Sequence, residues 1–248
     1  MKHLLLNLFR LCVASLLIGG GPKQSFAQAR AKINQPPLAS YTGSEQGSFK
    51  IFFGGELIGE ERYQISAEAT NYKAWAEIHL TLERGTDKVT FNIKPTLQFT
   101  RFFEPLSYKV LQEAGDNRMK ASIHFRPESS QAVYETGQET DSREIKLSED
   151  VMILDDNVFH HYVLLARRYD YLKAGVQEFS AFVPQQFLAG SISIADKGFE
   201  QIQLGNKTLS LQHLLVDTGE IQISLWLNEH HELQKISVPK SNVDVLRD

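Results

Sequence analysis

The sequence is almost free of cysteine, since Cys12 is the one thiol among its 248 residues. Disulfides, iron–sulfur clusters and cysteine nucleophiles all need thiols, so the chain beyond Cys12 has none of them. Motifs of several enzyme classes are missing too: the chain has no glycine-rich phosphate loop, no Gly-x-Ser-x-Gly turn and no His-Glu-x-x-His helix. We therefore expect a protein that is not an enzyme and that uses no cofactor.

Long apolar runs are also missing. The run Leu11–Ile18 follows the basic residues Lys2 and Arg10 and ends at a Gly-Gly-Gly-Pro break. It has roughly half of the ~20 apolar residues that a membrane-spanning helix needs. Ala27-Gln28-Ala29 then provides the small-x-small pattern of a signal-peptidase site. This order predicts a cleaved signal peptide over residues 1–29, export to the periplasm or the extracellular space, and no transmembrane segment after cleavage.

Positive charge is in slight deficit. The formal net charge is −4, and the predicted signal peptide contains Lys2, Arg10 and Lys23 but no acid. A mildly acidic chain with scattered charges argues against nucleic acid as a partner. Residues 30–46 are polar and contain Pro36-Pro37, which predicts a disordered leader. We expect one β-rich domain over residues 47–240 and a C-terminal tail over 241–248.

The pattern of the domain is an alternation of period two with short turns. Gly54-Gly55 and Gly205-Asn206 are two-residue hairpin signals, and Asp217-Thr218-Gly219 is a further turn. Ile221, Ile223, Leu225 and Leu227 face one side of a predicted strand, as Phe49, Ile51 and Phe53 do near the start. Further strands are predicted at 57–65, 74–82, 89–93, 97–103, 107–112, 120–125, 132–135, 144–147, 179–184, 191–195, 200–204, 207–216 and 233–238, with turns at 84–87 and 196–198.

One helix interrupts the strands. Asp155-Asp156-Asn157 offers an N-cap, and Val158, Tyr162, Leu165 and Tyr169 recur at helical spacing. The helix, at about residues 156–172, is apolar around much of its circumference and should therefore be buried. The predicted fold is mainly β: a single-domain curved antiparallel meander, half-barrel or barrel-like, wrapped around this helix.

The histidines and carboxylates do not predict a metal or an acid–base site. Neighbouring helical residues such as His160-His161 point about 100° apart, and neighbours on a strand point to opposite faces. His230-His231, flanked by Glu229 and Glu232, makes at most half a site and is more simply a solvated turn. Glu60-Glu61 lies on a strand and should place its two carboxylates on opposite faces, a poor geometry for acid–base chemistry. We expect no metal.

Two groups of residues could form a ligand site, and each has an alternative structural interpretation. Apolar residues including Phe49, Phe99, Phe102 and Leu227 either line a cavity or fill a core. Arg167-Arg168, with tyrosines nearby, either binds an anionic headgroup or complements the helix dipole. As ligand-binding candidates we take six residues: Phe53, Phe91, Phe103, Tyr162, Arg168 and Leu225.

The layout resembles a known group of exported proteins. The opening segment Gly47–Glu60, with an apolar strand, a glycine turn and Ile58-Gly59-Glu60, is similar to the start of an uncharacterised periplasmic family with curved antiparallel sheets. The hairpin of Ile223–Asn228 and Leu233–Pro239, and the aspartate-led helix at 155–170, fit the same order. Relatives of that family are half-barrels of the LolA type, which carry acyl chains between membranes. The resemblance implies an unknown function and brings no catalytic residues.

Three functions follow as hypotheses. The first is an exported, non-enzymatic envelope protein that binds a lipid-like or other apolar ligand between the curved sheet and the helix. The second is an envelope interaction or scaffold module with a filled core, which binds a protein partner through a sheet edge or its N-terminal tail. The third is a hydrolase without a recognisable motif.

Overall fold

The computed structural model describes residues 41–84, 87–173 and 175–248. The predicted signal peptide, most of the predicted leader and part of the predicted turn at 84–87 lie outside these residues. The first eight strands are β1 (Glu45–Phe53), β2 (Glu56–Ala67), β3 (Tyr72–Arg84), β4 (Asp87–Phe99), β5 (Pro105–Ala114), β6 (Asn117–His124), β7 (Ser130–Thr136) and β8 (Glu139–Ile145). Then follow β9 (Met152–Ile153), the helix α2 (His160–Arg168), β10 (Gln177–Val183), η1 (Pro184–Gln186), β11 (Leu188–Leu204), β12 (Lys207–Asp217), β13 (Gln222–Leu227), β14 (Leu233–Val238), η2 (Pro239–Ser241) and β15 (Val243–Arg247).

All described strands belong to one sheet, in the order β8-β7-β6-β5-β4-β3-β2-β1-β15-β14-β13-β12-β11-β10-β9. From β1 to β8 successive strands pair with each other, and so do successive strands from β10 to β15. The first and last strands join the two halves, with Ile51 opposite Val245. All pairs are antiparallel except β9 with β10. The sheet is not closed, because its end strands β8 and β9 are not paired with each other.

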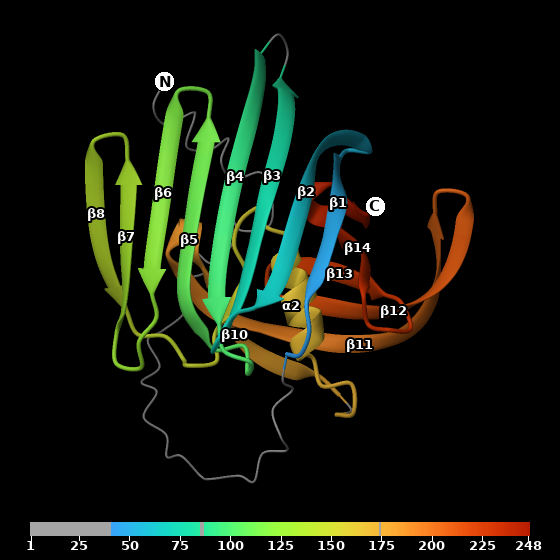
Figure 1. The fold of residues 1–248 in the computed structure, drawn as a ribbon. Coiled ribbons are helices and arrows are strands. Elements are labelled where there is room, and N and C mark those ends of the chain that lie inside the picture. Colours follow the sequence, from blue (N-terminus) through green and yellow to red (C-terminus); the bar gives the residue numbers. More distant parts are fainter. Residues whose placement is uncertain (1–40, 85–86, 174) are drawn as a thin grey trace.

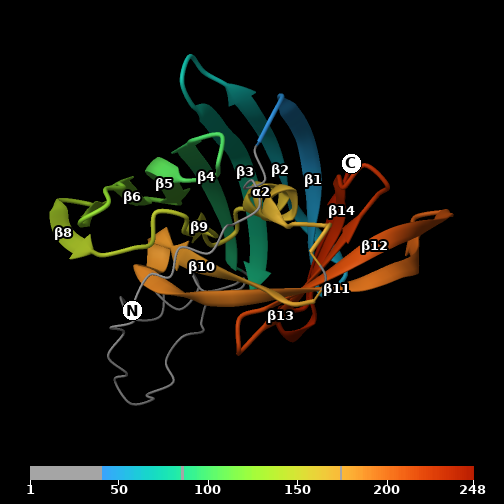
Figure 2. The ribbon, with the colours of Figure 1, turned by 90° about the horizontal axis from the view of Figure 1, so that it is seen from below.

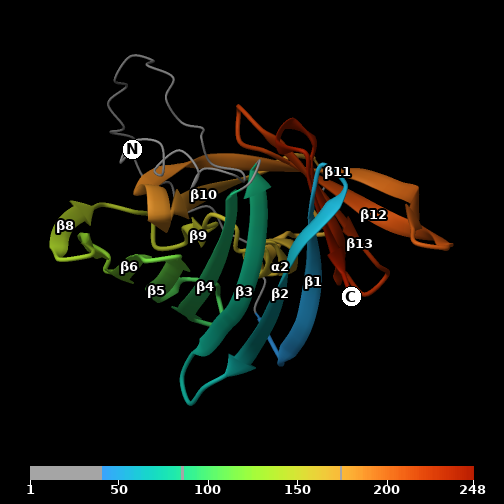
Figure 3. The same ribbon diagram turned by 90° about the horizontal axis from the view of Figure 1, so that it is seen from above.

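The sheet curves around α2. Strands β1–β6 stand as one wall and β10–β13 cross below them, with α2 between the two (Figure 1). The views from below and from above show α2 enclosed by the same two sets of strands (Figure 2, Figure 3). This confirms the prediction of a mainly β fold with a curved meander around one apolar helix. No helix among the described residues is both long and apolar enough to cross a membrane.

Alternation of apolar and polar residues produces the core. On β2, Tyr63 and Ile65 are buried while Arg62 is exposed. The predicted inward set of Ile221, Ile223, Leu225 and Leu227 is confirmed, since all four are buried. The predicted hairpin at Gly54-Gly55 is also confirmed, and both glycines have the positive φ that such a turn requires.

Two pairs of predicted strands are each one long strand. Strand β4 runs without a break through Pro95, where two strands were predicted. Pro95 has no N–H to donate, and the pairing of β4 with β3 skips it between Ile93 and Thr96. The turn predicted at Asp196-Lys197-Gly198 is also wrong, because these residues form a bulge inside β11 at which the register with β12 shifts.

The predicted ends of the domain need correction as well. The leader predicted over 30–46 is wrong over its last residues, because Tyr41 is buried against Tyr72, Phe99 and Phe103 and β1 starts at Glu45. The tail predicted over 241–248 is strand β15, in the middle of the sheet. A segment of five residues gives too short a pattern to indicate a strand, but between β1 and β14 it completes the hydrogen bonding of both.

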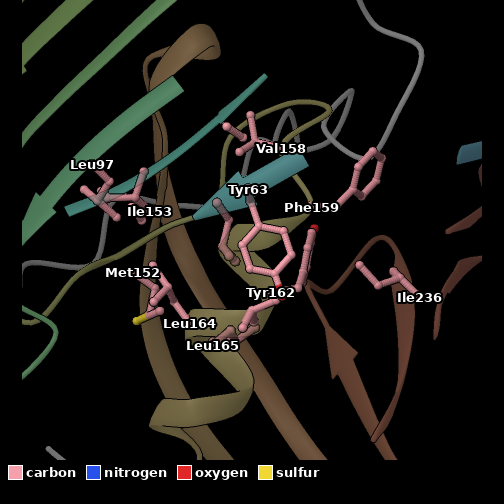
Figure 4. Close-up of a cluster of buried hydrophobic side chains, with 14 of the residues drawn as sticks. Tyr63, Leu97, Met152, Ile153, Val158, Phe159, Tyr162, Leu164, Leu165 and Ile236 are labelled. Atoms are coloured by element: carbon pink, nitrogen blue, oxygen red, sulfur yellow. The ribbon is translucent and has the colours of Figure 1, made fainter. Parts of the chain in front are cut away.

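The helix is shorter than predicted and begins differently. It spans His160–Arg168 rather than about 156–172, and the residue before it, Phe159, makes no side-chain cap. Asn157 has a φ of 59°, which is incompatible with a helix, and Tyr169 leaves the helical conformation with a ψ of 131°. The predicted N-cap at Asp155–Asn157 is therefore wrong. Figure 4 shows Val158, Tyr162 and Leu165 among the buried side chains of this region.

Gly59 gives a test of how closely β2 and β3 approach. A Cβ at this position would lie 2.0 Å from the carbonyl oxygen of His79, so a side chain must push the two strands apart. We expect Gly59→Ala to lower the free energy of unfolding by about 2 kcal/mol, measured by urea unfolding. Gly47→Ala is the control, because the atoms nearest to its added methyl belong to the end of the Tyr63 side chain and not to the backbone. An equal loss in the two variants would contradict the backbone contact.

Candidate functional site

A buried carboxylate on β2 holds the start of the helix. Glu61 is fully buried, and its two carboxylate oxygens accept the backbone N–H groups of Phe159 at 2.7 Å and His160 at 2.9 Å. The Nδ1 atom of His160 lies 2.6 Å from Glu61 Oε1. The first N–H groups of a helix have no partner within the helix, and they attract negative charge. Glu61 on β2 therefore caps the N-terminus of α2, which has no cap from its own neighbouring residues.

A second buried set continues from His160. The backbone N–H of Asp155 donates to His161 Nδ1 at 3.1 Å, which places the proton of neutral His161 on Nε2. The Asp155 carboxylate accepts the Tyr108 hydroxyl at 2.6 Å and the backbone N–H of Gln185 at 2.9 Å. Among the described residues, the Nε2 atoms of His160 and His161 have no hydrogen-bond partner. We call Glu61, Tyr108, Asp155, His160 and His161 the polar clamp.

Burial shifts the titration of the clamp. Desolvation raises the pKa of Asp155 to about 6 from its ordinary 3.8, although the bond from Tyr108 opposes this. Burial, and then the neighbouring His160, lowers the pKa of His161 well below 6.5. Burial and the Asp155 carboxylate raise the pKa of Tyr108. His161 is therefore neutral at pH 7.

The clamp was not predicted from the sequence, where Glu61 was considered only beside its neighbour Glu60. The two carboxylates do lie on opposite faces, since Glu61 is buried and Glu60 pairs with Arg62 at the surface. The signal that could have revealed it is the position of Glu61 in the alternation of β2, because Glu61 lies on the same face of the strand as the buried residues Tyr63 and Ile65. An acid at an inward position of a strand needs a partner in the core.

The free ends of the sheet meet through side chains. The Tyr134 hydroxyl on β7 donates to the Pro184 carbonyl of η1 at 2.6 Å, and its ring meets the Phe187 ring edge-on. The Arg143 guanidinium on β8 lies over both rings, 5.5 Å and 5.2 Å from their centres. We call this junction, Tyr134 and Arg143 facing Pro184–Phe187, the seam. Figure 2 shows the turn after β10 close to β6 and β8.

The clamp and the seam share one segment. Asp155 bonds Tyr108 on β5 and also Gln185 in η1, so its carboxylate joins the two halves of the sheet. Asp156 reinforces the η1 side, because its carbonyl accepts from Gln185 and its carboxylate accepts from Gln186. The two halves are therefore linked through the segment before α2 where no strand pairing links them.

A third polar group lies on the outer face of the sheet. Glu200 accepts from Trp226 Nε1 at 3.0 Å and lies 2.7 Å from His213 Nδ1, and the His213 and Trp226 rings stack. The bonds from Trp226 and then His213 lower the pKa of Glu200. Lys235 lies 5.1 Å from the centre of the Trp226 ring. This group fixes the long β11–β12 hairpin to β13.

The six predicted ligand-binding residues do not line one accessible surface. Phe53 is exposed at the end of β1, whereas Phe91, Phe103, Tyr162 and Leu225 are buried on β4, in the turn after β4, on α2 and on β13. Arg168 is buried, donates to Asp150 and lies over the Phe179 ring. The guanidinium group of Arg168 is therefore already engaged by Asp150 and Phe179.

Arg167 and the His230-His231 pair, which were also considered as binding or metal sites, contact other parts of the chain. Arg167 bonds Glu45 at 3.2 Å and the His230 carbonyl at 3.0 Å, which ties the end of α2 to β1 and to the β13–β14 turn. The His231 ring stacks on Tyr171 at 3.6 Å. Within the described residues, no group of three or more His, Cys, Asp or Glu is placed to hold a metal ion.

Glu61 and Glu60 allow a matched test of the clamp. We expect Glu61→Gln to lower the free energy of unfolding by about 3 kcal/mol. The change removes the negative charge of the carboxylate that accepts two helix N–H groups and contacts the His160 ring. Glu60→Gln, one residue away in a surface ion pair, should cost less than about 1 kcal/mol. Urea unfolding measures both. Similar losses would show that Glu61 is not the anchor of the helix.

The clamp also predicts opposite pH effects of two groups. Asp155 has a raised pKa in the folded state, so it adds stability as the pH falls from about 6 to about 4. His161 has a lowered pKa, so the unfolded chain is protonated first and stability is lost below about pH 6.5. In the wild-type protein the two contributions offset each other over this range.

Two single variants separate these contributions. With Asp155→Asn the free energy of unfolding should fall on acidification, by up to about 1.4 kcal/mol per pH unit. With His161→Asn, which keeps an acceptor for the Asp155 N–H, it should rise over the same range. Urea unfolding between pH 7 and about pH 4 measures both slopes. Parallel pH profiles for the two variants would contradict the shifts.

Comparison with known proteins gives a likeness in structure alone. No model of a known protein family matches the chain, and no curated protein matches it. A Brucella abortus crystal structure, described as a beta-barrel-like protein of domain of unknown function DUF1849, aligns with a TM-score of 0.55 at 6% identity, covering 82% of this chain and 94% of that one. A DUF1089 family protein from Pseudomonas aeruginosa aligns with a TM-score of 0.43 at 11% identity, covering 85% and 97%.

The first of these likenesses supports the architecture described above. At 6% identity it shows a shared fold and transfers no site residue. The curved sheet predicted from the family resemblance is confirmed. The chain is therefore similar in fold to that beta-barrel-like protein.

Proposed function

We propose that this chain is an exported, non-enzymatic envelope protein that binds a lipid-like apolar molecule within its curved sheet. The observation that carries the proposal is the open sheet. Its inner face is apolar over most strands, with Ile51, Ile78, Ile93 and Ile123 fully or almost fully buried. Its end strands are not paired with each other; apart from the chain segment 146–151 that connects β8 to β9, side-chain contacts hold them together. Side-chain contacts separate at lower cost than a ladder of backbone hydrogen bonds, because one hydrogen bond contributes only about 1 kcal/mol.

The non-enzymatic role is supported by the state of the carboxylate–imidazole pairs. The Glu61–His160 pair is fully buried, and its carboxylate already accepts two backbone N–H groups. The Glu200–His213 pair is held by Trp226, and the remaining nitrogen of His213 is buried. A general base must come within hydrogen-bond reach of the proton that it removes.

A second function is favoured by a different observation. All nine residues of α2 except Arg167 are buried, and the helix covers the inner face of the sheet. A filled interior leaves no room for a ligand and is compatible with an envelope interaction or scaffold module. Such a module would bind its protein partner through an edge of the sheet. Strand β8 is such an edge, because its residues from Glu139 to Glu144 are all exposed.

Ligand content decides between the two functions. The full-length chain is expressed in a host that exports it, purified without detergent, and examined by native mass spectrometry and by organic extraction. We expect an apolar molecule in the extract, or saturable uptake of dansylaminoundecanoic acid that unlabelled palmitate displaces. A folded protein with a clean apo mass and no saturable uptake would overturn ligand binding and favour the scaffold module.

A further inference from the structure

We propose that the seam between β7–β8 and η1 is where an acyl chain enters the sheet and lodges, between the rings of Tyr134 and Phe187. This inference rests on the proposed function and gives it a place and a ligand class. Three features of the molecule support it: the bonds that cross the seam, the side chains at its border, and the buried side chains behind it.

The chain connects the sheet's end strands through residues 146–151, but among the described residues few bonds cross the seam itself. From Tyr134 a single hydrogen bond crosses to Pro184, and from Arg143 a cation–π contact crosses to Phe187. Deeper inside, Asp155 links Tyr108 to Gln185. By contrast, β1 and β15, which join the two halves at the centre, are paired over five residues. The sheet therefore opens at the seam before it opens between β1 and β15.

The side chains that border the seam are apolar but only partly buried. Tyr134 lies on one side and Phe187 on the other, and both are partly buried. Ile145 and Leu147, which follow Arg143 in the chain, and Phe179 on β10 are partly buried as well. The inner face behind them is sealed, with Ala132, Ile123 and Phe182 fully buried. Phe187 contacts both Tyr134 and Phe182, so its ring covers the passage from the border to the inner face.

The geometry selects a single flexible chain as the occupant. Phe187 has a φ of 50°, an uncommon conformation for a bulky residue, which places its ring at the seam directly after η1. A linear hydrocarbon chain can lodge between this ring and Tyr134 without disturbing α2, which Glu61 holds from β2. A broad or branched ligand needs the helix itself to leave. The Arg143 guanidinium at the surface lies where the polar end of such a chain emerges.

Cross-linking tests the seam directly. In a Cys12→Ser chain, Arg143→Cys and Gln186→Cys are joined by a flexible bismaleimide, and uptake of dansylaminoundecanoic acid is measured before and after. We expect uptake to stop when the seam is cross-linked. The control is the same reagent across Thr81→Cys and Thr90→Cys, a neighbouring pair on β3 and β4, which should leave uptake unchanged.

Removal of one seam hydrogen bond should act in the opposite direction. Tyr134→Phe keeps the ring and deletes the bond to Pro184, so the uptake rate should rise about two- to tenfold, the range expected for one hydrogen bond. Tyr63→Phe is the control, because it also deletes one tyrosine hydrogen bond, that to Glu45, but far from the seam. Amide exchange of Gln185 and Phe187 should accelerate in Tyr134→Phe alone, which reports opening without any ligand.

The outcomes separate this inference from the proposed function. If the cross-linked protein takes up the probe at the rate of the uncross-linked protein, the seam is not the entrance, while ligand binding stands. Faster amide exchange in Tyr134→Phe without faster uptake also overturns the entrance. If no form of the folded protein takes up the probe, the proposed function fails and this inference fails with it.

Discussion

The position of the helix depends on one carboxylate buried in β2. Glu61 lies at an inward position of a sheet strand and reaches the N-terminus of α2 across 98 residues of sequence. A buried charge without partners costs several kcal/mol, and so do helix N–H groups left without acceptors in the core. Each therefore satisfies the other, and together they fix which turn of the helix faces which strand. The apolar side chains of α2 then pack wherever this contact places them.

The same region compensates for the incomplete closure of the sheet. The end strands differ greatly in length, seven residues in β8 against two in β9, so they cannot form a long ladder together. Asp155, Tyr134 and Arg143 hold the two halves together instead, each through contacts of a single side chain. The clamp fixes the centre of the molecule firmly, and the seam joins its ends weakly. This contrast between centre and ends makes the sheet a candidate container for a ligand.

Much of the fold could be predicted from local pattern. Alternation over β2 and β13, and the glycines of the β1–β2 turn, depend on backbone conformation and on two-residue periodicity, which neighbours in sequence determine. The predictions failed where a distant segment decides the outcome. Val243–Arg247 is a strand because β1 and β14 leave a place for it between them. The helix starts at His160 because Glu61 caps it there, whereas Asp155 and Asp156 bond η1 and β5.

Local sequence pattern was enough to predict the class of this protein: a mainly β chain with one apolar helix and with short turns between strands, because periodicity and turn residues act within a few positions. The sequence also indicated that Glu61 is unusual, because this acid stands at a position where the alternation of its strand predicts a buried side chain. The tertiary structure alone decided that Glu61 meets His160, that the first and last strands pair, and that the sheet stays open. Those contacts join residues separated by 50 to 200 positions, and only the folded chain brings them together.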